Sequence, residues 1–424
     1  MPNTTPKPYR VGIDLGGTNI KAGVIAAAGW AGSGAGPGSG GRTGSGARAE
    51  SGARAESGAG WADTGPGSDA KLGSAAGVAW ASSPDGLPRL LAAQSCPTKA
   101  ERPWREVAAD MAGLVDSLLT ELRISKNDCA ALGVGSPGLI DSAAGVVVFA
   151  GNLGWRDVPL AAWLRQRLDL PVSLSNDANC AAWGETQVGA GRGCQHVILL
   201  TLGTGIGSGV VVDGRLQEGG VPGGMELGHS LLILDGEPCT CGRRGCLEAY
   251  ASASALIRQA RAAVSAEALP AAEHLLSGQH SLAGRPSDQP AAAGSVAPGS
   301  AAPGSPAPAS LMLSLCGGDL TRLDGRVPFL AAAQGDAVAQ RVIATYIKYL
   351  GEGIINCVNI WRPEKILLAG GVAAAGQALL APLNDYARLR CFAGAKCFVA
   401  PIEAAALGND AGLIGAALLP PDDA

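Results

Sequence analysis

Three cysteines and a histidine lie close together in the middle of the sequence, at His229, Cys239, Cys241 and Cys246. Thiolate sulfur and imidazole nitrogen are ligands that zinc prefers, although this spacing is not that of a zinc finger. The other eight of the eleven cysteines are scattered without paired spacing, as expected for reduced thiols in the cytosol. The cluster therefore predicts a zinc site.

Two glycine turns, each following an apolar run, could bind phosphate. The first contains Asp14, Gly16, Gly17 and Thr18, and the second contains Gly203, Thr204 and Gly205. The amides of a tight glycine turn can approach phosphate oxygens closely, and an aspartate can hold a metal ion. A single glycine turn usually has no binding role. Here, however, the two segments match each other in the strand before the turn, in the turn itself and in the apolar residues after it. We interpret the match as a duplication that produced two related domains facing a nucleotide cleft.

Asn176 and Asp177 follow the apolar stretch 171–174, which is typical of a strand that delivers polar side chains to a domain junction. Such a pair can be an Asx turn or a helix cap. It can also supply a general base, with Asp177 taking the proton from a substrate hydroxyl during phosphoryl transfer. Glu226 and Glu248 bracket the cysteine cluster and are either ordinary surface glutamates or hydrogen-bond acceptors for sugar hydroxyls.

Other nucleotide motifs are weak or missing. The G-x-G-x-x-G match at 133–138, which directly follows an apolar run, contains Pro137 and continues into a loop-like stretch, whereas a dinucleotide fold needs a helix there. The sequence contains no G-x-x-x-x-G-K-[ST]. The net charge of -4 provides no basic face for nucleic acid or anionic lipid. We therefore expect neither a nucleic-acid nor a membrane partner.

The elements that must position these residues alternate between strand and helix patterns, which indicates an α/β protein. We predict hairpins at 9–25 and 197–212, helices at 104–122 and 337–358, and strands at 129–134 and 365–369. Two segments rich in Gly, Ala, Ser and Pro, at about 28–86 and 264–310, interrupt the pattern. They cannot bury enough apolar surface to offset the entropy of ordering them, so we expect flexible insertions.

With these residues in place, the chain resembles the ROK family of sugar kinases, and within it the bacterial glucokinases. The most specific motif is CTCGRRGCLE at 239–248, which matches the family pattern C-x-C-G-x-x-G-C-x-E and follows ELGH at 226–229. The order DLGGT, NDAN, LGTGIGSG, ELGH, cysteine cluster and AGG is also the family order. The resemblance covers nearly all of the chain outside the two insertions.

The resemblance implies an actin-like ATPase (ribonuclease H-like) fold, with two related α/β domains around a cleft. The small domain would comprise 1–178, completed by a C-terminal helix at 408–424, and the large domain 179–407 would carry the zinc site. ATP and Mg²⁺ would lie in the cleft. The implied ATP site consists of Asp14, Gly16, Gly17, Thr18, Lys21, Gly203, Thr204, Gly205, Gly370 and Gly371.

The resemblance also implies that Asp177 is the base acting on the 6-hydroxyl of the sugar. The remaining hydroxyls would be held by Asn152, Asn176, Glu226, His229 and Glu248. His229 would ligate zinc through one ring nitrogen and meet the sugar through the other. The zinc would thus be structural, ordering the sugar site rather than doing the chemistry.

Glucose is the expected substrate, giving glucose 6-phosphate at the expense of ATP. Other family members phosphorylate mannose, fructose, N-acetylglucosamine or N-acetylmannosamine, and some are sugar-responsive repressors with an N-terminal helix-turn-helix. About ten residues precede the first strand here, which disfavours a DNA-binding regulator. A non-catalytic, zinc-stabilised sugar-binding protein would not need Asp177 or both glycine turns.

We further expect a cytoplasmic protein, because residues 1–10 are polar and rich in proline and lack the apolar core of a signal peptide. A homodimer or homotetramer is the expected assembly.

Overall fold

The computed structural model describes residues 7–27, 87–220, 223–268 and 310–420 of the 424-residue chain. The expected first insertion, 28–86, lies outside the described residues, as does most of the second. The predicted start of the second insertion, at 264, is wrong, because α5 (Ala253–Ala268) continues through it. Leu256, Ala260 and Val264 are buried at helical spacing, so this alanine-rich stretch retains an apolar face.

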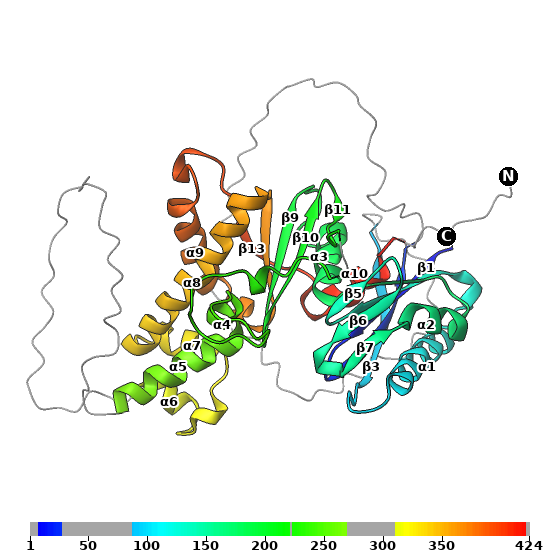
Figure 1. Cartoon of the computed structure of the whole chain (residues 1–424), viewed down its shortest axis with the longest axis horizontal. Helices are drawn as coiled ribbons and strands as arrows, with labels where there is room; N and C mark the ends of the chain where they lie inside the picture. Colours follow the sequence, from blue (N-terminus) through cyan, green and yellow to red (C-terminus); the bar gives the residue numbers. More distant parts are fainter. Residues whose placement is uncertain (1–6, 28–86, 221–222, 269–309, 421–424) are drawn as a thin grey trace, which may run out of the picture. The chain divides into compact units, whose positions relative to one another are not determined.

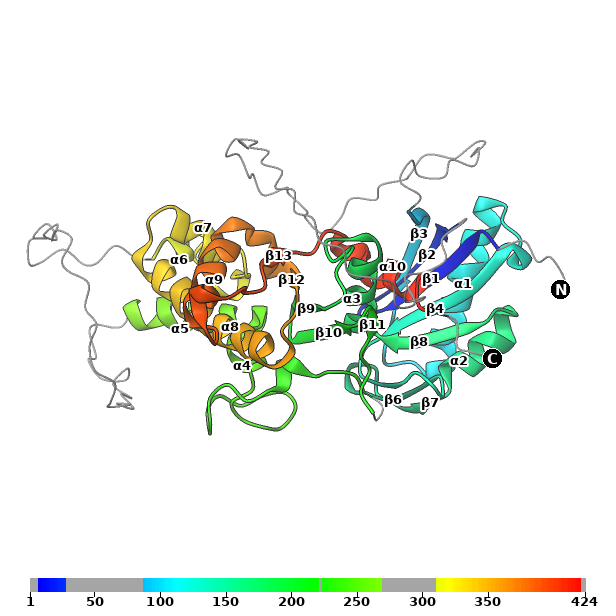
Figure 2. The ribbon, with the colours of Figure 1, turned by 90° about the horizontal axis from the view of Figure 1, so that it is seen from above.

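One sheet is built from the N-terminal part of the chain, coloured blue to green in Figure 1, with strands in the order β3-β2-β1-β4-β8 (Figure 2). Its strands are β1 (Tyr9–Leu15), β2 (Asn19–Ala26), β3 (Arg89–Pro97), β4 (Cys129–Ser136) and β8 (Val172–Asn176). The β1–β2 pair is the predicted antiparallel hairpin, and β4 and β8 run parallel to β1. The register places Asp14 beside Gly135, and Gly135 beside Ser175, so β1 and β8 deliver their last residues to the same edge.

The second sheet has the order β11-β10-β9-β12-β13. Its strands are β9 (Val197–Leu202), β10 (Ile206–Val212), β11 (Arg215–Leu216), β12 (Lys365–Ala369) and β13 (Ile402–Ala404). It also begins with an antiparallel hairpin, β9–β10, followed by strands parallel to the first member of that hairpin. The two sheets therefore share the arrangement of a hairpin with parallel strands beside it.

A small third sheet follows β4, formed by β5 (Leu139–Asp141), β6 (Val146–Ala150) and β7 (Trp155–Val158). Because β4 leads into β5 and not into a helix, the G-x-G-x-x-G match does not form a dinucleotide site. The short helix η2 (Gly151–Leu153) between β6 and β7 carries Asn152.

Helix α1 (Trp104–Leu122) has the predicted bounds, and α2 (Leu160–Leu168) precedes β8. The buried residues of α1 include Val107, Met111, Val115 and Leu118, spaced three or four apart, and they join a core with residues of β1 and β2. This core supports the sheet edge at which Asp14 and Asp177 lie.

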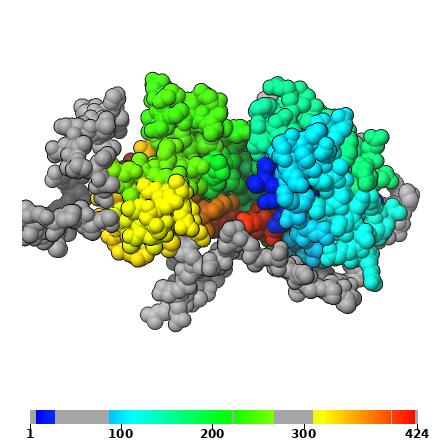
Figure 3. Space-filling model, turned by 90° about the horizontal axis from the view of Figure 1, so that it is seen from below, coloured from blue at the N-terminus to red at the C-terminus, as the bar shows by residue number. Residues whose placement is uncertain are grey.

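The chain end returns to the first sheet through α10 (Ala411–Ala417), which packs against α3 (Asp177–Val188), β1 and β4 (Figure 2). Close approach depends on glycine, since a Cβ on Gly12 would lie 2.2 Å from the carbonyl oxygen of Leu413. In the space-filling view the red C-terminal surface borders the blue N-terminal strands (Figure 3).

The chain divides into two compact units, residues 1–255 with 346–424 and residues 256–345. The predicted domain boundary at 178 falls inside the first unit and stays a prediction. The remaining α-helices are α4 (Glu248–Ala251), α6 (Leu311–Leu315), α7 (Val327–Ala333), α8 (Ala337–Trp361) and α9 (Gln377–Arg390). None of the described helices is long and apolar enough to cross a bilayer.

Candidate active site

The first glycine turn joins β1 to β2 and is held from outside by Thr98. The amide of Gly16 donates to the carbonyl of Asn19 at 2.9 Å, which closes the turn. Thr98 is fully buried. Its hydroxyl donates a hydrogen bond to the carbonyl oxygen of Gly16 at 2.7 Å, and its amide donates one to the carbonyl oxygen of Thr18 at 2.8 Å. Sequence reasoning did not find Thr98, because a threonine after a strand forms no recognisable motif.

Asn152 lies directly beside this turn. Its Nδ2 atom lies 3.0 Å from the point that a Cβ on Gly17 would occupy, so any side chain larger than glycine would crowd the amide. The structure thus brings the predicted sugar residue Asn152 and the predicted phosphate residue Gly17 together.

Asn176 ends β8 and caps α3. Its Oδ1 accepts hydrogen bonds from the amides of Ala178 (2.9 Å) and Asn179 (3.3 Å), and its Nδ2 donates to the carbonyl of Gly138 (3.2 Å). The capping interpretation of the Asn-Asp pair is therefore realised for Asn176. A hydrogen bond from Asn176 to a sugar stays a prediction.

Asp177 is the first residue of α3, and its Oδ1 accepts a hydrogen bond from the amide of Ala178 at 2.8 Å. Burial raises the pKa of Asp177 above its usual value. Burial, together with the charge of Asp177, also raises the pKa of Asp14 to about 6. The two carboxylates therefore share one electrostatic environment at the edge of the first sheet.

Lys21, predicted to meet ATP, forms an ion pair with Asp410, just before α10. Asp410 was not predicted as a site residue, because 389 positions separate it from Lys21. The residue that precedes α10 thus pairs with the strand that follows the first phosphate turn.

The second glycine turn joins β9 to β10. The amide of Gly203 donates to the carbonyl of Gly205 at 3.0 Å, and the amide of Ile206 donates to Oε2 of Glu248 at 3.0 Å. Gly370, at the end of β12, has a φ of 88°, and a Cβ there would lie 2.5 Å from the carbonyl oxygen of Leu202. Gly370 therefore borders this turn in a conformation that requires glycine, and its contact with adenosine stays a prediction.

Three other predicted ATP residues are exposed, as a ligand contact requires. They are Thr18, Thr204 and Gly371.

Glu226 precedes η3 (Leu227–His229), and this short helix is fixed to β10 by Ser208. The Ser208 hydroxyl accepts a hydrogen bond from the amide of Leu227 at 3.0 Å and donates to the carbonyl of Met225. Burial raises the pKa of Glu226, and the charges of Asp177 and Glu248 raise it further. The charge of Glu226 therefore interacts both with Asp177, at the first sheet, and with Glu248, beside the second glycine turn.

The first turn of α3 also connects the two sheets. Gly207 and Gly209 of β10 lie against Ala178, since a Cβ on Gly209 would lie 2.7 Å from the carbonyl oxygen of Ala178. This packing places β10 and η3 next to the residue that follows Asp177.

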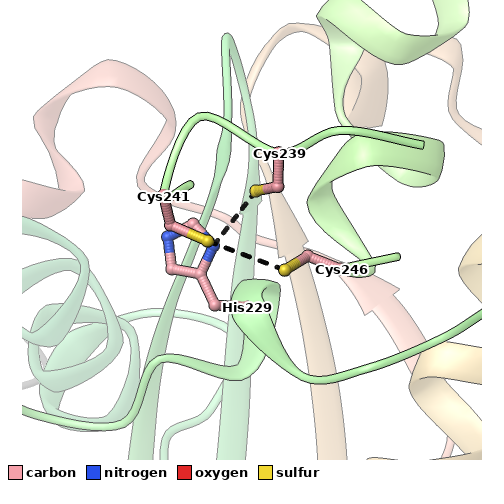
Figure 4. A group of neighbouring side chains, drawn as sticks. All are labelled: His229, Cys239, Cys241 and Cys246. Carbon is pink, nitrogen blue, oxygen red and sulfur yellow. Dashed lines mark hydrogen bonds between the residues drawn. The ribbon is translucent and has the colours of Figure 1, made fainter. Parts of the chain in front are cut away.

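The predicted zinc ligands come together on the loop between η3 and α4 (Figure 4). One Nδ1 or Nε2 atom of His229 and the sulfur atoms of Cys239, Cys241 and Cys246 all lie within 4.8 Å of one another. The Nδ1 of His229 lies 3.5 Å from Sγ of Cys239, and the sulfurs of Cys241 and Cys246 are 3.7 Å apart. Three sulfurs and one nitrogen at these separations fit a four-coordinate zinc ion.

Glu248 connects this cluster to the second glycine turn. Its Oε1 accepts a hydrogen bond from the hydroxyl of Thr240 at 2.8 Å, while its Oε2 accepts the one from Ile206. The cysteine loop and the phosphate turn are therefore joined through one side chain.

Residues 91–423 match the sequence profile of the ROK family. The chain belongs to the ROK family. It is 36% identical over 326 residues to the glucokinase of Halalkalibacterium halodurans, covering 75% of this chain and 84% of that protein. It is 31% identical over 306 residues to the glucokinase of Streptomyces coelicolor, covering 72% and 84% of the two chains.

Among solved ROK structures, a glucokinase from Streptomyces griseus in complex with glucose and AMPPNP superimposes with a TM-score of 0.63. The two share 26% sequence identity over 96% of this chain and 98% of that one. ROK sugar kinases have the actin-like ATPase fold, so the expected fold class is confirmed.

Proposed function

We propose that this ROK protein is a glucokinase, which transfers the γ-phosphoryl group of ATP to the 6-hydroxyl of glucose. The observation that carries the proposal is the position of the half-buried Asp177 carboxylate. It lies at the edge of the first sheet that also bears the first glycine turn, beside which Asn152 lies, in a chain 36% identical to a glucokinase. A carboxylate so placed suits a base that acts on a hydroxyl next to bound phosphate.

In this mechanism Asp177 takes the proton of the 6-hydroxyl while that oxygen attacks the γ-phosphorus. The bond from the γ-phosphorus to the bridging oxygen breaks, and ADP leaves. The hydrogen bond from the amide of Ala178 fixes one carboxylate oxygen, which leaves the other for the proton.

The glycine turns would hold the phosphates through their backbone amides, with Gly370 and Gly371 near the adenosine. Lys21 supports the first turn through its ion pair with Asp410. Mg²⁺ bound with ATP would neutralise phosphate charge, and Asp14 is the carboxylate proposed to hold it. The pKa of Asp14, raised to about 6 by burial and by the charge of Asp177, is consistent with a position where a cation would stabilise the carboxylate.

Glucose would be held by acceptors, because its hydroxyls are hydrogen-bond donors. Glu226 is a carboxylate whose pKa is raised by burial and by the charges of Asp177 and Glu248, Glu248 is a second carboxylate, and Asn152 and Asn176 add amide groups. A neutral polyol suits such an acidic site better than an anionic substrate.

Zinc is proposed as a structural ion held by His229, Cys239, Cys241 and Cys246. The donor set and the separations support this assignment. Nδ1 of His229 lies near Sγ of Cys239, so Nε2 would be the nitrogen that meets a sugar hydroxyl, and zinc would orient the ring. A homodimer or homotetramer in the cytoplasm stays part of the proposal.

The test is an ADP-release assay with purified protein, Mg-ATP and a panel of glucose, mannose, fructose, N-acetylglucosamine and N-acetylmannosamine. We expect the highest kcat/KM with glucose. A higher value with an N-acetylated sugar would replace the substrate but keep the catalytic residues, and no ADP release with any sugar would favour a non-catalytic binding protein.

A further inference from the structure

Glu218, in the loop after β11, holds two segments of the first half of the chain. Its Oε1 accepts hydrogen bonds from the hydroxyl of Ser142, at 2.9 Å, and from the hydroxyl of Ser175. Ser175 is almost fully buried in β8, two positions before Asp177, and Ser142 follows β5. One carboxylate oxygen of Glu218 therefore joins the end of β8, which precedes Asp177, to the loop after β11 of the second sheet.

The same loop continues to the predicted sugar residues. The amide of Gly224 donates to the carbonyl of Glu218 at 3.1 Å, and a Cβ on Gly224 would lie 3.1 Å from Nδ2 of the buried Asn179. Two residues later comes Glu226. Glu218 thus contacts both the strand that precedes Asp177 and the segment that precedes Glu226.

We propose that Glu218 is a positioning residue, which keeps the carboxylate of Asp177 in register with Glu226 through its bonds to Ser175 and Ser142. The inference rests on the proposed kinase function and goes beyond it, since Glu218 belongs to none of the sequence motifs. Hydrogen bonds to an ionised acceptor are stronger than those between neutral groups, so a carboxylate suits a two-hydroxyl acceptor.

The expected effect follows from geometry. A shift of about 1 Å in a reacting group can cost on the order of 100-fold in rate. Because Ser175 is only two residues from Asp177, loss of its anchor changes the position of the base more than the binding of ATP.

The experiment compares Glu218→Ala, Glu218→Gln and Ser175→Ala in the full-length protein, with kcat and KM measured for glucose and Mg-ATP. Glu364→Ala is the matched control, since Glu364 also accepts two hydrogen bonds, from the amides of Gln195 and His196, away from the site. We expect kcat to fall roughly 10- to 100-fold in Glu218→Ala with the KM for Mg-ATP within about 2-fold. Glu218→Gln should recover to within about 3-fold of wild type, because its amide oxygen can accept both hydroxyls.

Ser175→Ala should also lower kcat. Combining it with Glu218→Ala should cause little further loss of kcat, since both substitutions remove the same hydrogen bond between Ser175 and Glu218. The inference is overturned if Glu218→Ala keeps kcat within about 3-fold of wild type, if it loses no more than Glu364→Ala, or if Glu218→Gln is as damaged as Glu218→Ala. If Glu218→Ala does not fold, an undiminished kcat in Ser175→Ala overturns it. An inactive wild type would instead contradict the proposed function, which separates the two failures.

Discussion

Asp177 combines partial burial, a fixed carboxylate oxygen and a place at the start of a helix. Asp177→Asn keeps the size of the side chain but removes the base. We expect this variant to fold, to bind glucose and zinc, and to lose turnover by several orders of magnitude. Near-normal ADP release, with glucose binding by calorimetry unchanged, would remove Asp177 from the role of base.

The raised pKa of Asp177 also predicts the pH dependence of activity. Only the ionised carboxylate can take a proton, so kcat/KM for glucose should fall as the pH decreases through the raised pKa. The acid limb should therefore lie above the value of about 3.9 that is usual for aspartate. A discontinuous ADP assay from pH 4 to 9 measures the profile, and a plateau extending down to that usual value would contradict the prediction.

At the scale of elements, the loop between η3 and α4 contains only two isolated β-bridges, Leu231 with Cys246 and Pro238 with Arg244. Its order should therefore depend on zinc. We expect Cys246→Ser to lose bound zinc and to raise the KM for glucose by more than about 10-fold, because the loop that holds His229 and Glu248 in place would lose its order. This magnitude is on the order of the loss in affinity or activity that follows removal of the partners of a metal site.

Cys397→Ser is the control for this change, since Cys397 is exposed and lies outside the cluster. Metal content by mass spectrometry and sugar kinetics provide the readouts. Equal zinc content in Cys246→Ser and wild type would refute the proposed ligand set.

Helix α10 is the second element whose position matters. A Cβ on Gly415 would lie 1.6 Å from the carbonyl oxygen of Cys180, so Gly415→Ala should destabilise the protein by about 1–3 kcal/mol through overpacking. Gly113, in the middle of α1, has no atom near its would-be Cβ, so Gly113→Ala should stabilise by about 0.5–1 kcal/mol. Thermal unfolding of the pair is the measurement, and equal melting temperatures would show that α10 is free to move away.

At the scale of the whole molecule, the glycine-rich segment 28–86 interrupts the chain after β2 without removing a motif. We expect deletion of residues 32–67 to leave turnover within a few-fold, because β2 and β3 are already paired along their length. A much larger loss in a still-folded variant would show that the segment is functional.

Local patterns in the sequence determined much of this protein. The hairpins, α1, β12 and the cysteine cluster were predictable, because strand alternation, helical spacing and ligand chemistry are encoded by neighbouring residues. The same reasoning located the two glycine turns and Asp177. It failed at Val264, where a low-complexity composition hid an apolar helix face.

Only the tertiary structure showed how these parts are held. Thr98 reaches the first turn because β3 pairs with β2, Asp410 reaches Lys21 across most of the chain, and Glu218 reaches Ser175 from another sheet. None of these residues belongs to a local pattern, since their partners are set by strand pairing and packing over long sequence separations. The sequence therefore determined which residues could do chemistry, and the long-range contacts decided which side chains position them.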